Sequence, residues 1–334
     1  MADTPEPDTP EPEVPEPLPE DLSAAEPPPE DVGPTRTDVG LGDGTVAWRA
    51  LMAEAADALV EVGIASADVE ARRIVEEASG REGAELHAHL DEPATVGGVA
   101  ALDRMVERRR AGEPLQYVLG RWGFRTLDLM VDDRVLIPRS ETEGVVDHVL
   151  AELDRHVADD GGAPVVVDLG CGSGAIGLAV AAERPATEVH AVDVEPGAVA
   201  VARANLAGLG MAGSSVTLHE GSWYAPLPPD LAGRVAVVAS NPPYVAASDE
   251  LPHEVGGWEP AAALVPGPTG LEAIEVIVAE AATWLAPGGA LVVEIGESQG
   301  EAVRAQAEAA GLVDVEVRPD LLGRDRALVA RAPR

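Results

Sequence analysis

The chain contains no lysine. All 23 of its basic residues are arginine, against 59 acidic residues, and the formal net charge is −36. Binding to the backbone of DNA or RNA relies on many cationic side chains that displace counterions, so this balance disfavours it. We therefore expect no direct nucleic-acid partner.

Cysteine occurs once, at Cys171, which excludes an intrachain disulfide framework and makes a cysteine-rich metal site implausible. Aromatic residues make up only 3% of the chain. The start shows no cationic stretch followed by an apolar one, and no uninterrupted apolar run reaches the roughly 18 residues of a membrane-spanning helix. These absences favour a cytoplasmic protein with no metal cofactor and no membrane partner.

Proline and acidic residues dominate the beginning of the chain. Residues 1–35 contain 11 prolines and 11 acidic residues but no basic one. Proline favours extended conformations, like charges repel, and little apolar surface is available to offset the entropy of ordering. We expect residues 1–44 to form a disordered tail.

Apolar residues at helical spacing follow this tail. The first stripe consists of Trp48, Leu51, Met52, Ala55, Leu59 and Val60. A second helix, with Ser66 as its N-cap and Gly80 as its stop, has an apolar side made of Val69, Ile74, Val75 and Ala78. A third helix over about 97–111 ends in Arg108–Arg110, which we interpret as a solvated helix end. The pattern predicts a small helical bundle over 45–112.

Beyond the bundle, residues 113–143 alternate enough to suggest a β-hairpin linker, and residues 144–334 alternate between strand and helix patterns. This alternation predicts an α/β domain with a mostly parallel sheet and helices on both faces. Ligands of such folds bind at the carboxyl ends of the strands.

The segment VVVDLGCGSGAIGLAV predicts a cofactor turn between the first strand of this domain and its helix. It contains Asp168, Gly170, Gly172 and Gly174 in a D-x-G-x-G-x-G spacing, which differs from the dinucleotide and P-loop patterns. Asp193 ends the next strand, where its carboxylate can accept hydrogen bonds from both hydroxyls of an adenosine ribose. This pairing favours S-adenosylmethionine, and Cys171 is interpreted as a small turn residue rather than a nucleophile.

Trp223 lies just after the third strand of the domain. A tryptophan there can belong to the core, or it can stack on the adenine of a cofactor bound in the neighbouring cleft. Its position alone leaves both interpretations open.

The segment SNPPYVA follows the apolar run VAVVAS, which predicts a fourth strand beside the first. Asn241 should then emerge next to the glycine-rich turn. Its side-chain oxygen and the Pro242 carbonyl can each accept a hydrogen from a planar NH2 group, and Tyr244 can stack on the group that bears it. Such a site orients a weakly nucleophilic nitrogen toward a sulfonium methyl group, which predicts methyl transfer to an amide or adenine nitrogen.

Several short motifs together resemble one family. The segments GEPLQYVLG, VLIPRSETE, DLGCGSGAIGLA, NPPY, WEPAAAL and VVEIGESQG occur in the order typical of release-factor glutamine N5-methyltransferases, the HemK/PrmC-like family of class I S-adenosylmethionine-dependent methyltransferases. The resemblance covers about residues 46–331. It implies a helical bundle for substrate recognition, a hairpin linker and a seven-stranded Rossmann-like domain over 144–334. It also implies methylation of the glutamine amide in the Gly-Gly-Gln motif of peptide-chain release factors.

Carried over by motif, the resemblance implies a cofactor site made of Gly170, Cys171, Gly172, Ser173, Gly174, Asp193, Trp223 and Asn241. It implies a substrate site made of Asn241, Pro242, Pro243 and Tyr244, of which Asn241, Pro242 and Tyr244 are the catalytic residues. No metal takes part in the implied reaction.

Three positions depart from the family pattern: Ser140 replaces a usual proline, Thr269 a usual aspartate, and Ala236, expected just before the fourth strand, a residue that is commonly acidic. These departures leave open a glutamine methyltransferase of another protein, such as a ribosomal protein. Adenine-N6 methyltransferases of RNA or DNA also carry Asn-Pro-Pro-Tyr or a close relative of it, although the charge of this chain disfavours them. A third alternative is a non-catalytic adaptor that keeps the cleft, against which the intact Asp193, Asn241 and Tyr244 argue.

Overall fold

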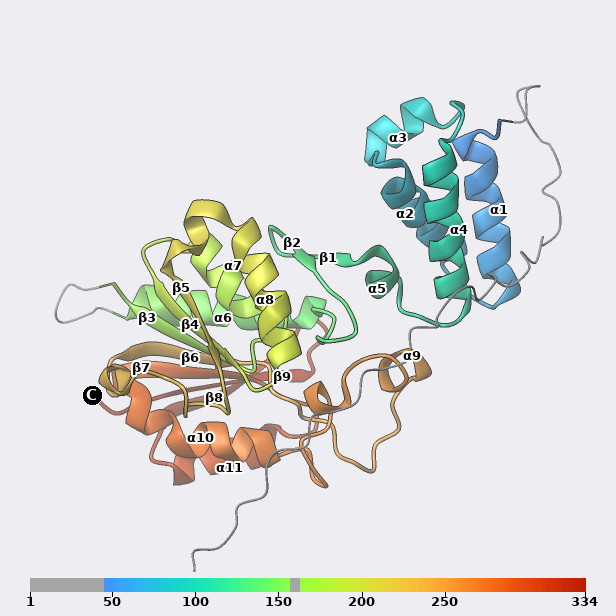
Figure 1. Ribbon diagram of the computed structural model, residues 1–334. Helices are drawn as coiled ribbons and strands as arrows, with labels where there is room; N and C mark the ends of the chain where they lie inside the picture. Colours follow the sequence, from blue (N-terminus) through green and yellow to red (C-terminus); the bar gives the residue numbers. More distant parts are fainter. Residues whose placement is uncertain (1–44, 157–162) are drawn as a thin grey trace, which may run out of the picture. The chain divides into compact units, whose positions relative to one another are not determined.

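The computed structural model in Figure 1 describes residues 45–156 and 163–334. The tail expected over residues 1–44 lies outside the described residues. Within the described part of the chain, no helix is both long enough and apolar enough to cross a membrane.

The first described segment is helical. Its helices are α1 (Trp48–Glu61), α2 (Ala67–Ser79), α3 (Gly83–His89), α4 (Val96–Arg110) and α5 (Leu115–Leu119). They share a core of their own, to which α1 contributes Trp48, Leu51, Ala55 and Leu59. Gly80 ends α2 in the left-handed conformation, with φ 68°, as expected for a glycine stop.

Two sequence expectations for this segment are wrong, and a third, Ser66 as the N-cap of α2, holds for its position but not for its side chain. Val60 and Val69 are 61% and 62% exposed, because each lies at the flank of its helix's apolar stripe rather than within it. Ser66 precedes α2 but makes no capping bond with its side chain, which instead donates to Glu70.

The interpretation of Arg108–Arg110 as a solvated helix end is wrong for Arg109, which is buried and only 6% exposed. Its Nε donates to Glu70 Oε2 at 2.6 Å, and its Nη2 donates to Glu254 Oε1 at 2.8 Å. A guanidinium can be buried in this way because carboxylates pair with it. Arg109 thereby joins α4 to α9 (His253–Gly256), which follows the Asn-Pro-Pro-Tyr segment.

A short antiparallel hairpin of β1 (Arg121–Phe124) and β2 (Leu127–Met130) follows α5. It leads into α6 (Ser140–Arg155), a helix that the sequence analysis did not predict.

The rest of the chain forms a seven-stranded sheet with the strand order β5-β4-β3-β6-β7-β9-β8. The strands are β3 (Val165–Leu169), β4 (Glu188–Asp193), β5 (Val216–Glu220), β6 (Val235–Ser240), β7 (Leu285–Glu294), β8 (Val313–Pro319) and β9 (Asp325–Arg331). The first five strands of that order run parallel, whereas β9 is antiparallel to both β7 and β8. The predicted α/β fold is confirmed, as is the pairing of the fourth strand with the first.

Helices cover both faces of the sheet (Figure 1). They are α6, α7 (Ala175–Glu183) and α8 (Pro196–Gly208) on one face, and α10 (Glu272–Trp284) and α11 (Gly300–Ala309) on the other. Strand β3 shows why both faces are apolar: Val165, Val167 and Leu169 join the core under α10, and Val166 joins the core under α6 and α7. Single 3-10 turns lie at Gly210–Ser215, Pro229–Leu231 and Ala261–Ala263.

A buried ion pair ties α6 to the sheet. Glu152 and Arg331, only 4% and 7% exposed, form two hydrogen bonds of 2.8 and 2.7 Å. Although burial alone raises the pKa of Glu152, the hydrogen bonds and charge of Arg331 hold it below its usual value.

We expect Glu152→Gln to lower the free energy of unfolding by about 3 kcal/mol, because it leaves a buried guanidinium with only a longer contact of 3.4 Å to the exposed Asp314. The matched control is Glu316→Gln, whose carboxylate pairs with Arg318 near the surface and whose loss should cost under about 1 kcal/mol. Urea denaturation near neutral pH measures both. In wild type the contribution of the pair is present above the unfolded-state pKa of glutamate and is lost as the pH falls through the lower native pKa. Equal stability of the two variants would contradict this role.

Candidate active site

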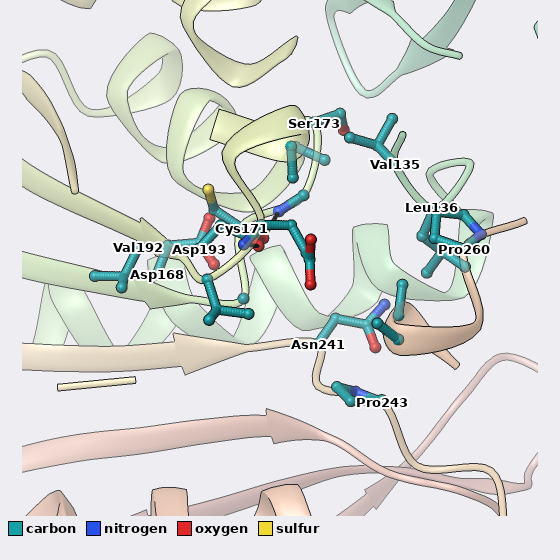
Figure 2. Close-up of a pocket in the computed structure, with 18 of the residues that line it drawn as sticks. Val135, Leu136, Asp168, Cys171, Ser173, Val192, Asp193, Asn241, Pro243 and Pro260 are labelled. Atoms are coloured by element: carbon teal, nitrogen blue, oxygen red, sulfur yellow. Dashed lines mark hydrogen bonds between the residues drawn. The ribbon is translucent and has the colours of Figure 1, made fainter. Parts of the chain in front are cut away.

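A pocket lies at the carboxyl ends of β3, β4 and β6, where a ligand of this fold is expected. Among its lining residues are the predicted Gly170, Cys171, Gly172, Ser173, Asp193, Trp223, Asn241 and Pro243. Figure 2 shows Asn241 at the end of β6, facing the turn that carries Cys171 and Ser173. Gly174, Pro242 and Tyr244 are not among the lining residues, so the pocket brings together most of the predicted site.

The glycine-rich turn needs glycine at two points for different reasons. Gly170 has φ 69°, and a Cβ there would lie 3.5 Å from the ring of Trp223, toward the pocket. Gly174 has φ 85° at the start of α7, where a Cβ would lie only 2.9 Å from Leu178 Cδ1. Glycine at 170 is therefore favoured by the left-handed backbone, whereas Gly174 also permits close packing of the helix.

Asp168 lies beneath this turn and is buried. Its Oδ2 accepts a hydrogen bond of 2.9 Å from the Gly177 amide, and its Oδ1 has no hydrogen-bond partner among the described residues. Burial, with a smaller contribution from the charge of Asp193, raises the pKa of Asp168 to about 7. A pocket-lining carboxylate with an unpartnered oxygen suits a cationic ligand group, such as the ammonium of a bound amino acid. The sequence analysis quoted Asp168 in its motif without giving it a contact.

Asp193 ends β4 and lines the same pocket. Its Oδ2 accepts from the Gly172 amide at 2.8 Å and its Oδ1 from the Glu195 amide at 3.0 Å. Burial raises the pKa of this carboxyl, and the two amide hydrogen bonds oppose that effect. Each carboxylate oxygen can accept more than one hydrogen bond, so both can also bind hydroxyl groups of a ribose. The two carboxylates of this pocket, as hydrogen-bond acceptors, therefore fit an adenosyl ligand that carries an amino acid.

Trp223 and Cys171 flank that ligand space. Trp223 has φ 46°, a left-handed conformation that is uncommon for a bulky residue and occurs often at functional sites. Burial raises the pKa of the Cys171 thiol, so this group stays protonated and is a poor nucleophile. This supports the interpretation of Cys171 as a small turn residue.

Two hydrogen bonds place Asn241 beside the glycine-rich turn. The Ser240 hydroxyl donates to the Leu169 carbonyl at 2.7 Å, which ties the end of β6 to the end of β3. The Asn241 side chain then donates from Nδ2 to Thr142 Oγ1 at 3.1 Å. Because Nδ2 is directed at Thr142, Oδ1 is the acceptor that Asn241 can offer to a ligand.

Tyr244 is held away from the cofactor part of the pocket. Its hydroxyl donates to Glu294 Oε1 at 3.2 Å, and its carbonyl accepts from Gln299 Nε2 at 3.0 Å. Burial, followed by the charge of Glu294, raises the pKa of Tyr244, which keeps the phenol protonated. Gly270 approaches the same backbone so closely that a Cβ would lie 2.5 Å from the Tyr244 carbonyl oxygen. Gln299 and Gly270 therefore fix the position of the Tyr244 carbonyl, at the end of the Asn-Pro-Pro-Tyr segment.

Sequence reasoning assigned no role to Thr142, Glu294 or Gln299. All three lie in quoted motifs, VLIPRSETE and VVEIGESQG, so a signal was present. What the motifs alone do not reveal is that their side chains converge on Asn-Pro-Pro-Tyr.

Of the three positions that depart from the family pattern, Ala236 lies within β6 rather than before it and is buried, whereas the other two serve local structure. Ser140 begins α6, and its hydroxyl donates to Glu141 at 2.9 Å. Thr269 Oγ1 donates to Glu272 Oε1 at 2.9 Å and accepts from the Leu271 amide at 3.2 Å, while Glu272 also accepts from the Thr269 amide. Threonine thereby closes the turn before α10. Neither residue is a lining residue of the pocket.

The outer side of the pocket is formed by residues around 134–138 and 260–263. Tyr117 donates to the Val135 carbonyl at 2.5 Å, which holds the first of these segments against α5. The buried Glu259 accepts from the Ile137 amide at 3.2 Å and also from Arg139, which links the two segments. Within residues 45–156 and 163–334, no group of three or more His, Cys, Asp or Glu residues is arranged to hold a metal ion.

Comparison with known proteins gives matches to both the helical and the α/β segments. Residues 50–120 match the family model described as PrmC N-terminal domain, and residues 145–255 match the model described as Methyltransferase small domain.

Curated relatives match over most of their length. A release factor glutamine methyltransferase from Xylella fastidiosa (strain 9a5c) is 42% identical over 251 residues, covering 74% of this chain and 87% of the relative. Relatives with the same name from Cereibacter sphaeroides and Caulobacter vibrioides are 41% and 39% identical, covering 82% and 85% of this chain and 95% and 94% of the relatives. Identity of this level over both segments shows that the chain belongs to the release factor glutamine methyltransferase family and is a methyltransferase.

Proposed function

We propose that this enzyme transfers a methyl group from S-adenosylmethionine to the side-chain amide nitrogen (N5) of the glutamine in the Gly-Gly-Gln motif of peptide-chain release factors. The observation that carries the proposal is that Asn241 and Pro243 line one pocket together with Asp168 and Asp193. Asn241, an acceptor for an amide NH2 group, thus lies beside acceptors for a cofactor. The names of the curated relatives support a release-factor glutamine as the substrate.

The cofactor would lie across the carboxyl ends of β3 and β4. Asp193 would accept hydrogen bonds from the ribose hydroxyls, Asp168 would pair with the ammonium group, and Trp223 would contact the adenine. Gly170, Cys171, Gly172 and Ser173 would form the turn around the amino-acid part, with Asn241 close to both ligands. When bound, S-adenosylmethionine supplies a methyl group activated by its sulfonium.

The chain's own contribution to the reaction is orientation. Asn241 Oδ1 and the Pro242 carbonyl would each accept one hydrogen of the substrate NH2 group, which directs the nitrogen lone pair toward the methyl carbon. The same two acceptors stabilise the positive charge that develops on nitrogen as the N–C bond forms. The S–CH3 bond would break as the N–C bond forms, its electron pair would stay with the sulfur of the departing S-adenosylhomocysteine, and the nitrogen would lose one proton to solvent to give the neutral N-methyl amide. Pro243 would wall the amide, and Tyr244 would contribute the stacking surface predicted from its position.

We assign substrate recognition to the helical bundle, residues 45–112, which has its own core and contributes no lining residue to the pocket. Residues 113–143 would be the linker, and 144–334 the methyl-transfer domain. A direct nucleic-acid partner is disfavoured by the net charge of −36. The cytoplasmic location expected from the sequence stays a prediction.

The test is to incubate the full chain with methyl-labelled S-adenosylmethionine and each release factor of its source organism. We expect one methyl group per release factor, located by mass spectrometry on the glutamine of the Gly-Gly-Gln peptide. A release factor with that glutamine replaced by alanine is the matched control and should take up no label.

Equal labelling of the glutamine-free release factor would refute the substrate assignment. Parallel incubations with ribosomal proteins and with adenine-containing RNA and DNA test the alternative substrates of methyltransferases that carry Asn-Pro-Pro-Tyr. Label on one of these and none on any release factor would replace the proposed substrate by that one. Cofactor binding without transfer to any of them would favour a non-catalytic adaptor.

A further inference from the structure

We propose that Glu294 is a positioning residue for methyl transfer: through Thr142 it fixes the direction in which the Asn241 side-chain amide faces. This inference rests on the proposed function, because it concerns the contact between Asn241 and the substrate NH2 group. Neither Glu294 nor Thr142 is among the site residues predicted from the sequence.

Glu294 ends β7, directly beside β6, and is only 1% exposed. Its two carboxylate oxygens hold different parts of the site. Oε2 accepts a hydrogen bond of 2.6 Å from Thr142 Oγ1, and Oε1 accepts one of 3.2 Å from the Tyr244 hydroxyl. A single buried carboxylate is therefore connected to both ends of the Asn-Pro-Pro-Tyr motif.

The direction of these hydrogen bonds decides the orientation of Asn241. The Thr142 hydroxyl has one hydrogen, and the Glu294 carboxylate takes it, so Thr142 Oγ1 can only accept from other groups. The group that donates to it is Asn241 Nδ2, at 3.1 Å. Asn241 Oδ1 is then the atom left for the substrate. In the flipped orientation Asn241 would present its own NH2 to the substrate NH2, and two donors cannot form a hydrogen bond.

Protonation of Glu294 would reverse the direction of these hydrogen bonds. A protonated carboxyl can donate to Thr142 Oγ1, whose hydrogen then turns to Asn241 and favours the flipped amide. Burial and the negative charge of Glu141 raise the pKa of Glu294, whereas the hydrogen bonds of Thr142 and Tyr244 and the charge of Arg326 on β9 oppose the rise. With a raised pKa, activity is present above that pKa and is lost as the pH falls through it.

The decisive variant is Glu294→Gln. Its single side-chain oxygen can accept from Thr142 or from Tyr244 but not from both, and its NH2 group must face the other. We expect kcat to fall by about 10- to 100-fold, because the productive orientation of Asn241 is no longer enforced. The KM for S-adenosylmethionine should stay unchanged. In the wild-type enzyme at saturating cofactor, kcat should fall toward acid pH as Glu294 is protonated. In Glu294→Gln this part of the fall should be absent. The exposed Glu297, three residues further on, provides the control: Glu297→Gln should retain both the rate and the pH profile.

Variants of Thr142 test the same connection without removing the buried carboxylate. Thr142→Val has the same shape but no hydroxyl and should show the same loss of kcat, whereas Thr142→Ser keeps the hydroxyl and should restore it. In the double variant of Glu294→Gln with Thr142→Val, we expect no further loss, because both changes break one hydrogen-bond chain. Urea denaturation of each variant separates a loss of folded protein from a loss of rate.

A wild-type rate and pH profile in Glu294→Gln would overturn the inference, as would a Thr142→Ser variant as slow as Thr142→Val. Strictly additive losses in the double variant would also contradict it. Failure of the proposed function has a different signature: the wild-type enzyme itself would then transfer no methyl group to a release-factor glutamine.

Discussion

Replacing Asn241 by alanine is expected to lower kcat for glutamine methylation by about 10³-fold, while the enzyme stays folded and still binds S-adenosylmethionine through Asp193 and the glycine-rich turn. In the proposed reaction, the alanine variant would lose the side-chain oxygen that orients the substrate NH2 group and stabilises the charge developing on its nitrogen. Loss of one preorganised group of this kind typically costs about 10²- to 10³-fold, and loss of alignment adds to that effect.

The loss in Asn241→Ala should appear in a single-turnover experiment with labelled cofactor and excess enzyme, because this measures the transfer step alone. Asn241 is only partly buried and its side chain forms one hydrogen bond, to Thr142, so the free energy of unfolding should change little. Calorimetric titration with S-adenosylmethionine is the control for the cofactor site. Transfer at the wild-type rate in this variant would refute the role of Asn241.

The second large effect is expected for Asp193→Ala, which should raise the Kd for S-adenosylmethionine by about 10²- to 10⁴-fold. In the proposed complex, the variant would lose two hydrogen bonds between a carboxylate and ribose hydroxyls, each worth about 1.5–3 kcal/mol, where 1.4 kcal/mol corresponds to tenfold. It also releases the amide of Gly172, which the carboxylate holds at 2.8 Å, so the glycine-rich turn becomes less well ordered.

The register of the sheet offers a matched control for Asp193. Glu220 on β5 lies directly opposite Asp193 in the strand pairing, and its carboxylate is exposed and outside the pocket. Glu220→Ala removes a carboxylate at the same level of the sheet and should leave the Kd unchanged. Comparable weakening in both variants would mean that the effect comes from net charge rather than from ribose contacts.

The fold was largely predictable because its signals are local. Alternation of apolar strands and helices gave every strand of the large sheet, and a glycine-rich turn followed by Asp193 indicated where a cofactor binds. The missed helix α6 had such a signal too, since Val145, Val146, Val149, Leu150 and Leu153 repeat at helical spacing and are all buried. That helix was overlooked because the preceding hairpin pattern was extended into its first turn.

Contacts between distant parts of the chain could not be predicted in the same way. Thr142 lies 99 residues from Asn241 and 152 residues from Glu294, and the three meet because β6 and β7 are neighbours and α6 packs against both of them. Arg109 was misjudged for the same reason, because its partners Glu70 and Glu254 are 39 and 145 residues away. A single sequence shows which groups can pair, whereas the topology decides which of them meet.

The hydrogen bond from Ser240 to the Leu169 carbonyl has a consequence for how methyl donor and acceptor are spaced. It joins two strands of one sheet at the level where the glycine-rich turn and Asn241 begin. Neighbouring strands lie about 4.8 Å apart, a distance set by backbone hydrogen bonding. The sheet thus sets the distance between the glycine-rich turn and Asn241. The segments around 134–138 and 260–263 line the pocket but lie outside the sheet, so they do not set this spacing.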